Sequence, residues 1–377
     1  MKLIRLKAVA IKEFIQIFRD PRSLALAATI PVLLLLLFGF ALTLDVDRIP
    51  TVFLDFDRTP RSREMSDRFL RSRYFQLEAY VSHYAELQEF LDRGQALMGL
   101  VIPANFSRDL EANRETRIQL LMDGTDANTA TIALGYATAI VALYSQELLK
   151  QKMNALGMAR ISPPIEPRIR IWFNPDLESK NFIVPGLIAV IMVILAAILT
   201  SGTVAREWER GSMEQLISTP IRNAELILGK LIPYFLIGFF DLALSVAMGR
   251  FLFNVPLRGS GFLLFSLVSL FLLGAICQGV VVSIITKNQL LSSQISIFIS
   301  YLPTFILSGF IYPIDNMPKL IQLITYIFPS RYVVSILKGI FSKGIGFEVL
   351  WVEAAFLVVY AALMVFIALR KFEKRIA

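Results

Sequence analysis

The sequence gathers charged side chains at one place in its apolar C-terminal half, residues 206–221. Three glutamates and two arginines stand there between two long uncharged runs, and charges at this density cannot remain in hydrocarbon. We therefore expect a loop on one membrane face. The chemistry that such a loop supports is docking through ion pairs and hydrogen bonds, because its acids and bases would be presented outside the bilayer.

The loop also contains signals for a short helix. Gly211 can end a preceding helix in a left-handed conformation, and Thr219-Pro220 stops the next one. Ser212 and Gln215 have the spacing of a capping box, so we expect a helix to begin there. Met213, Leu216 and Ile217 would line one of its faces, with Glu214 elsewhere. The simpler alternative is a solvated connector with no partner.

Other kinds of site are excluded by single residues. The one cysteine, Cys277, lies in an apolar run, which excludes a disulfide framework and a thiolate metal site. The one histidine, His83, excludes a histidine metal cluster and a Ser-His triad. Gly229-Lys230 lacks the upstream glycine and the following hydroxyl of a phosphate-binding loop. We expect this chain to bind no metal and no cofactor, and not to hydrolyse nucleotide by that route.

Composition indicates a membrane protein. Of 377 residues, 55% are hydrophobic and only 18% are charged, against about 25% in soluble proteins. The net charge of +8 does not indicate a nucleic-acid partner, because the basic residues cluster at the ends of apolar runs, as orientation signals do. The lipid bilayer is thus the expected surroundings.

Residues 1–22 predict an amphipathic helix that lies in the membrane interface on the cytoplasmic side. Ile4, Ile11 and Phe18 recur at helical spacing, while Lys and Arg occupy other faces. Residues 23–44 carry no charge and are long enough to span the bilayer. A cleaved signal peptide is the alternative, but the basic lead-in is too long and no A-x-A-like site follows.

Residues 45–176 change character, since charges become frequent and no run reaches the length of a span. Strands and helices alternate, which predicts an α/β domain inserted between spans 1 and 2. No catalytic constellation is evident among its carboxylates. The expected strands are 51–55, 75–81, 97–102, 117–122 and a return strand at 169–173.

Residues 177–377 predict spans 2 to 6. An even total of six places both basic termini on one side, which the positive-inside rule makes cytoplasmic, with the α/β domain outside. Residues 315–348 are too polar to cross, and we expect short helices that dip into the outer leaflet and turn back. The five expected spans are 181–205, 224–249, 259–286, 288–314 and 349–369.

The segment Arg206-Glu-Trp-Glu-Arg-Gly-Ser-Met-Glu-Gln-Leu-Ile-Ser-Thr-Pro resembles the R-E-x-E-x-G-[TS]-x-E-x-L-x-x-[TS]-P signature of type 2 ABC exporter permeases, the daunorubicin-resistance and multidrug-export kind. Phe328-Pro-Ser-Arg-Tyr332, followed by Lys338-Gly339 and Lys343-Gly344, resembles the segment before that family's last span. The order of parts agrees over nearly the whole chain. Ser212 replaces a commoner threonine.

The resemblance implies a permease of the bacterial inner membrane that exports amphipathic or lipid-like compounds. A separate ATP-binding cassette subunit would hold ATP and Mg, and residues 206–221 would be the coupling helix that meets it. A second permease, identical or paralogous, would complete the pathway, and a periplasmic adaptor is a further partner. The ATPase-coupling residues would be Arg206, Glu207, Glu209, Arg210, Gly211, Glu214, Leu216, Thr219 and Pro220. The signature residues before the last span are Pro329, Arg331, Gly339 and Gly344.

Asp241 is a carboxylate within a predicted span. Because such a group is costly in hydrocarbon, it usually faces protein or water. It could line the substrate path, sit at the pairing interface, or be neutral and hydrogen-bonded to a neighbour. An ion-coupled secondary transporter that uses Asp241 is one alternative function, although no repeat between halves supports it. A non-transporting envelope scaffold or receptor is another.

Overall fold

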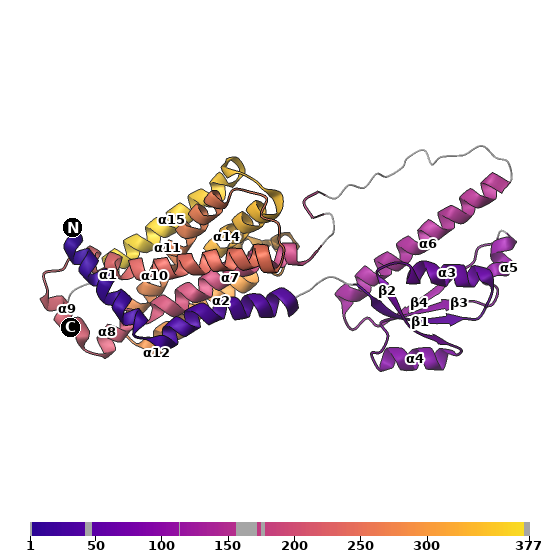
Figure 1. The fold of residues 1–377 in the computed structure, drawn as a ribbon, viewed down its shortest axis with the longest axis horizontal. Helices are drawn as coiled ribbons and strands as arrows, with labels where there is room; N and C mark the ends of the chain where they lie inside the picture. The colour runs from indigo at the N-terminus through magenta and orange to yellow at the C-terminus, as the bar shows by residue number, and fades with distance from the viewer. Residues whose placement is uncertain (1, 42–46, 113, 156–171, 175–177, 373–377) are drawn as a thin grey trace. The chain divides into compact units, whose positions relative to one another are not determined.

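The computed structural model describes residues 2–41, 47–112, 114–155, 172–174 and 178–372. The chain divides into two compact units. One, the membrane unit, lies within 1–43 and 170–377, and the other, the sheet unit, lies within 44–169. Each is described below by itself (Figure 1).

The sheet unit contains a four-stranded sheet in the order β2-β1-β3-β4. β1 pairs in parallel with both β2 and β3, and β4 pairs antiparallel with β3. Buried apolar residues fill β1 and β3, as central strands of a sheet covered on both faces require. The alternation of strands and helices thus gave the expected α/β unit. The strands are β1 (Ile49–Asp55), β2 (Phe75–Val81), β3 (Met98–Ile102) and β4 (Gln119–Met122).

Helices cover both faces of this sheet (Figure 1). On one face, Met65 and Phe69 of α3 and Ala133 and Tyr144 of α6 join one core cluster with the sheet. On the other face, Leu87 of α4 joins a second cluster. The helices are α3 (Pro60–Leu70), α4 (Tyr84–Asp92), α5 (Phe106–Glu111) and α6 (Ala127–Ala155). The return strand expected at 169–173 falls largely outside the described residues, and Trp172 and Phe173 lie in no strand.

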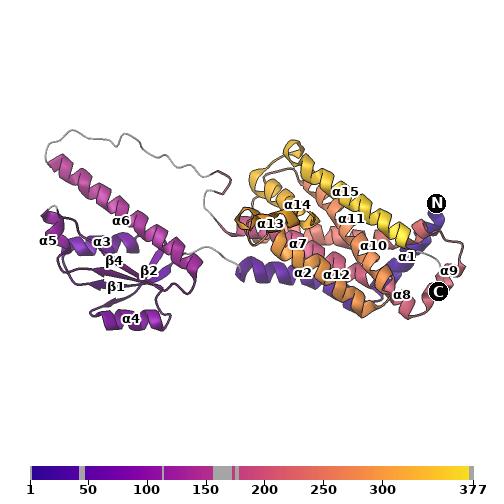
Figure 2. The ribbon, with the colours of Figure 1, turned by 180° about the vertical axis from the view of Figure 1, so that it is seen from behind.

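The membrane unit is a bundle of long apolar helices around one large core. In Figures 1 and 2, α11 and α15 run side by side, and α7 lies among its neighbours with nearly all of its side chains buried. Its long helices are α2 (Pro21–Ala41), α7 (Lys180–Ser201), α10 (Asn223–Ala247), α11 (Gly261–Thr286), α12 (Gln289–Leu307) and α15 (Phe347–Lys371).

Shorter helices complete this unit. A π-helical turn, η1, continues α10, and another, η3, continues α14. The short helices are α1 (Leu3–Phe18), α8 (Ala205–Glu209), α9 (Ser212–Ser218), η1 (Met248–Leu252), η2 (Ile314–Asn316), α13 (Lys319–Thr325), α14 (Pro329–Lys338) and η3 (Gly339–Lys343).

Six helices among the described residues are long and apolar enough to cross a membrane, but they are not the six that the sequence predicted. They include α6, whereas within α2 only a shorter apolar stretch, 28–40, meets the composition test. α6 packs against the sheet, and its Glu147 pairs with Arg68 of α3 at 2.7 Å. α2 has 21 residues, enough for about 31 Å at 1.5 Å per residue. The prediction of six spans therefore requires that α2 crosses and α6 does not.

The segment before α15 is broken into short helices, and the expected dip of residues 315–348 into the outer leaflet stays a prediction. α13 and the continuous α14–η3 meet at an angle of 88°. Pro329 occupies the first turn of α14, where its missing N–H costs no hydrogen bond. The bend therefore has a local cause in the sequence.

Both described ends of the chain lie at the same end of the bundle. The backbone N–H of Lys2 donates to Glu225 Oε1 at 2.6 Å, and Asn223 Nδ2 donates to the carbonyl of Phe372 at 2.7 Å. Since Asn223 begins α10, the starts of α1 and α10 and the end of α15 meet there. α8 and α9 lie at this end too (Figure 1).

Candidate functional site

The charged loop folds as two short helices with a corner between them. α8 ends at Glu209, Gly211 has the left-handed φ of 68°, and α9 begins at Ser212. The expected start of the helix is thus confirmed, but the expected capping box is wrong. Gly211 itself takes the N-cap position, so Ser212 is already helical, and its hydroxyl donates to the carbonyl of Glu207 instead, at 3.4 Å.

The left-handed backbone of Gly211 leads to a prediction about its replacement. A Cβ there would meet no atom within 4 Å, so only backbone strain opposes a side chain. We expect Gly211→Ala to lower the free energy of unfolding by about 1–2 kcal/mol, because a left-handed L-residue is strained. Gly211→Asn should cost less, since asparagine tolerates this conformation. Thermal unfolding of the purified variants measures both, and an alanine variant as stable as the asparagine variant would contradict the assignment.

Behind the corner lies a cluster of four charged side chains, called here the ion cluster: buried Glu13, Glu207 and Lys230, and exposed Lys12. Lys230 Nζ of α10 lies 2.8 Å from Glu13 Oε1 of α1 and 2.9 Å from Glu207 Oε2 of α8. Lys230 is 1% exposed and Glu207 3% exposed. Lys12 also pairs with both carboxylates. The ion cluster therefore ties the N-terminal helix, the loop and a span together.

Charge within the ion cluster is balanced, with two ammonium groups and two carboxylates. Burial alone would raise the pKa of Glu13, but the ammonium groups of Lys230 and Lys12 outweigh it and lower that pKa. Burial alone would lower the pKa of Lys12, but the carboxylates of Glu13 and Glu207 outweigh it and raise that pKa. Each charge thus stabilises its neighbours, and loss of any one leaves the others uncompensated.

Further contacts fix the loop to spans on its other side. Ser283 Oγ of α11 accepts hydrogen bonds from the backbone N–H groups of Val204 and Ala205, at 3.1 and 2.9 Å. Glu209 Oε1 accepts from the N–H of Gln289, at the start of α12, at 2.8 Å. The loop is therefore attached to α10, α11 and α12 together.

The helix α1 lies directly on α10 at Gly229. A Cβ at Gly229 would lie 2.8 Å from Val9 Cβ and 3.1 Å from the carbonyl oxygen of Leu6. We expect Gly229→Leu to push α1 off α10 and to expose α1 to limited proteolysis in the purified protein. Gly135→Leu on α6 is the matched control, since Gly135 is exposed and a Cβ there meets nothing within 4 Å. Unchanged proteolysis of Gly229→Leu would contradict the close packing.

The predicted coupling residues divide by exposure. Glu207 is buried in the ion cluster and so faces its own chain, and Arg206 is half-buried beside Asp20, at 3.5 Å. Leu216 and Thr219 are half-buried too. The exposed ones are Glu209, Arg210, Gly211, Glu214 and Pro220.

A hollow of about 440 Å³ lies between α1 and the loop, large enough to receive side chains of a partner. Its wall includes buried Glu207 and exposed Arg210, so it presents both charges. We call the exposed loop residues together with this hollow the coupling surface. The hollow is lined by Lys12, Gln16, Arg206, Glu207, Arg210, Ser212, Gln215, Leu216 and Thr219.

The other predicted site residues lie elsewhere. Asp241 is 2% exposed inside the membrane unit, and its Oδ2 has no hydrogen-bond partner among the described residues. Because Asp241 is already buried within its own chain, the structure does not support its expected place at the interface with a second permease. Arg331 stacks over Tyr326, 3.7 Å from the ring centroid. Pro329 starts α14, Gly339 starts η3, and Gly344 closes η3 with a φ of 67°. These signature residues shape the bend before α15.

The sequence reasoning missed Glu13 and Lys230 as partners. Lys230 lies in a predicted span, and no local pattern assigns it or Glu13 to a site. Two signals could have found them: Lys230 needs an acid, and Glu13 shares the buried face of α1 with Val9 and Ile17. Within the described ranges, no group of three or more His, Cys, Asp or Glu could hold a metal.

Comparisons with known proteins agree with this architecture. The sequence model of the protein family described as "ABC-2 family transporter protein" matches residues 22–370 of this chain. The chain is 38% identical over 376 residues to the "Probable multidrug ABC transporter permease YbhS" of Escherichia coli K12, covering 99% of this chain and 97% of that protein. It is 31% identical to the corresponding YbhR, covering 92% of each, and 30% identical to the "Inner membrane transport permease YhhJ", covering 77% and 76%. With a family match over residues 22–370 and a relative that is 38% identical over 99% of the chain, the chain belongs to the ABC-2 family of transporter proteins.

Proposed function

We propose that this chain is the permease subunit of an ATP-driven exporter in a bacterial inner membrane. It moves amphipathic or lipid-like compounds outward, with ATP and Mg bound by a separate ATP-binding subunit. The names of its relatives, a multidrug ABC transporter permease and an inner membrane transport permease, support this assignment. The termini and the coupling surface then face the cytoplasm, and the sheet unit faces the periplasm.

One observation carries the proposal: an exposed, charged loop is bonded through buried ion pairs to α1 and α10. Exposed Glu209, Arg210 and Glu214 supply a polar contact for the ATPase. The ion cluster behind them transmits its movement, because Lys230 holds both α1 and α8 within 3 Å of one ammonium group. A scaffold or receptor would not need its membrane helices bonded in this way to an exposed cytosolic loop.

Co-purification tests the proposal. The tagged full chain is expressed with the P-loop ATPase encoded in a neighbouring reading frame, and with a second permease where one is encoded there. We expect a stable complex that hydrolyses ATP, whereas the permease chain alone shows no ATPase activity. Export of Nile red, an uncharged amphipathic dye, from cells should require both subunits. Export without any ATPase would favour an ion-coupled transporter, and no export at all would favour a scaffold.

A further inference from the structure

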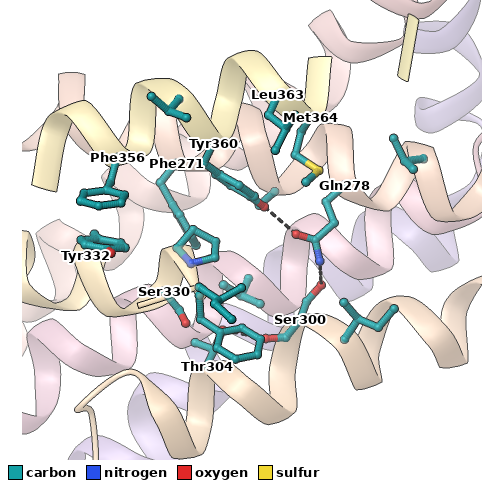
Figure 3. A pocket seen from close by; sticks show the side chains of 18 of the residues that line it. Phe271, Gln278, Ser300, Thr304, Ser330, Tyr332, Phe356, Tyr360, Leu363 and Met364 are labelled. Carbon is teal, nitrogen blue, oxygen red and sulfur yellow. Dashed lines mark hydrogen bonds between the residues drawn. The ribbon is translucent and has the colours of Figure 1, made fainter. Parts of the chain in front are cut away.

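The membrane unit contains a cavity of about 600 Å³ that is separate from the coupling surface. Helices α11, α12, α14 and α15 surround it (Figure 3), so its walls come from a single chain. Pockets of roughly 300–1,000 Å³ hold small organic ligands. None of the described residues that line it carries a charge. The lining is mostly aliphatic and aromatic, including Phe271, Ala275, Tyr332, Phe356, Leu363 and Met364.

A short chain of polar groups crosses this apolar wall. The Tyr360 hydroxyl donates to Gln278 Oε1 at 2.6 Å, and Gln278 Nε2 donates to Ser300 Oγ at 3.1 Å (Figure 3). Gln278 has two N–H donors, and a second one is therefore available to a ligand. These three side chains come from α15, α11 and α12, so the polar chain links three of the helices that line the cavity.

Ser330 supplies a second and independent indication. It is 2% exposed, it lines the cavity, and its hydroxyl has no hydrogen-bond partner among the described residues. An unpaired buried hydroxyl is unfavourable, so a ligand that bonds to it gains affinity. Ser330 also lies in the first turn of α14, which has no side-chain cap. A hydroxyl or carbonyl oxygen of a ligand would find a hydrogen-bond partner there.

We propose that this cavity binds an uncharged, lipid-like molecule from the bilayer, with one long apolar part and one hydroxyl or carbonyl group. The apolar part lies against the aromatic and aliphatic wall, and the polar group bonds to Ser330 and the Gln278 chain. A permanent charge would find no ion-pair partner among the described lining residues, which favours an uncharged ligand. Entry from the bilayer is consistent with the exposed apolar side chains of the bordering helices, such as Phe298 and Val359. As a substrate site this inference rests on the proposed export function, but binding itself needs no ATPase.

Photolabelling of the purified full chain in an uncharged detergent tests the site. The probes are a hexadecanol with a diazirine in its chain and a quaternary ammonium compound of the same chain length. We expect the alcohol to label cavity residues within 326–332 and 356–364, and the ammonium compound to label them about tenfold less. Equal labelling by both probes, or labelling confined to outward-facing residues, would overturn the proposal.

Variants with matched controls sharpen this experiment. Ala275→Phe fills the cavity and should reduce alcohol labelling about tenfold or more, whereas Ala355→Phe on the exposed face of α15 should not. Ser330→Ala and Tyr360→Phe preserve shape and should each reduce it about threefold, as expected for one lost hydrogen bond, whereas exposed Ser266→Ala should not. If Ala275→Phe fails to fold, alcohol labelling of Ser330→Ala and Tyr360→Phe alone tests the site.

The remaining outcomes separate this proposal from the exporter assignment. Alcohol labelling present in the single permease but absent from the paired permease would mean that a partner helix fills the cavity, which overturns the ligand site. No labelling in a chain that still activates its ATPase would overturn the site and leave the exporter assignment standing. Labelling of the cavity in a chain that never binds an ATPase would support the ligand site and overturn the exporter assignment.

Discussion

Lys230→Met is expected to destabilise the membrane unit by about 3–5 kcal/mol and to abolish ATPase activity of the complex. The substitution removes the ammonium group that lies 2.8 Å from Glu13 and 2.9 Å from Glu207. Removing one partner of a buried ion pair is this costly because the remaining carboxylates stay in a low-dielectric site. Thermal unfolding of the purified chain measures the first effect, and ATP hydrolysis by the assembled complex measures the second.

A double variant that keeps the ion cluster electrically balanced is the control for this prediction. In Lys230→Met/Glu13→Gln one charge of each sign is removed, and Lys12 still pairs with Glu207. We expect the double variant to regain most of the lost stability, since the uncompensated carboxylate is gone. Exposed Lys371→Met should change stability by no more than about 0.5 kcal/mol. A single variant as stable as the parent, or a double variant as unstable as the single one, would contradict the role given to the ion cluster.

Glu214→Arg is expected to weaken binding of the ATP-binding subunit about tenfold, or about 1.4 kcal/mol, without unfolding the chain. Glu214 is exposed on α9 and makes no ion pair within the part of the chain that the structure describes. Its carboxylate is therefore available to a partner, and reversal of its charge replaces attraction by repulsion. Titration of the purified permease with its ATPase measures the dissociation constant.

Two controls distinguish a lost contact with the ATPase from unfolding of the chain: the salt dependence of binding, and a charge reversal at a distant residue. Binding by the parent chain should weaken as ionic strength rises, because exposed charges are screened, and Glu214→Arg should lose that dependence. Glu78→Arg reverses an equally exposed glutamate on β2 of the sheet unit and should leave binding unchanged. If Glu214→Arg binds the ATPase as tightly as the parent chain does, the loop is a solvated connector after all.

Local patterns in the sequence were sufficient for much of the fold. The alternation of strands and helices predicted β1 to β4, because each strand is short and bounded by turn residues. Gly211 predicted the corner between α8 and α9 correctly, since few residues other than glycine take a positive φ easily.

Contacts between distant residues could not be predicted in this way. Glu13 and Lys230 are 217 residues apart, and no local spacing connects them. The loop therefore looked like a row of equivalent charges, although Glu207 turns inward while Glu214 stays exposed. The cavity around Gln278 could not be predicted for the same reason, because its walls come from helices far apart in the sequence. Composition was also ambiguous for α6, whose apolar face could pack on a sheet or meet lipid.

Coupling to an ATP-binding subunit requires that the coupling surface faces the cytoplasm. Cys277 is buried, so Glu214→Cys supplies an accessible thiol against a silent background. A membrane-impermeant maleimide should label Glu214→Cys in inverted vesicles but not in intact cells, and should label Glu78→Cys of the sheet unit in intact cells. Labelling of Glu214→Cys in intact cells would place the loop outside, where no ATP-binding subunit could reach it.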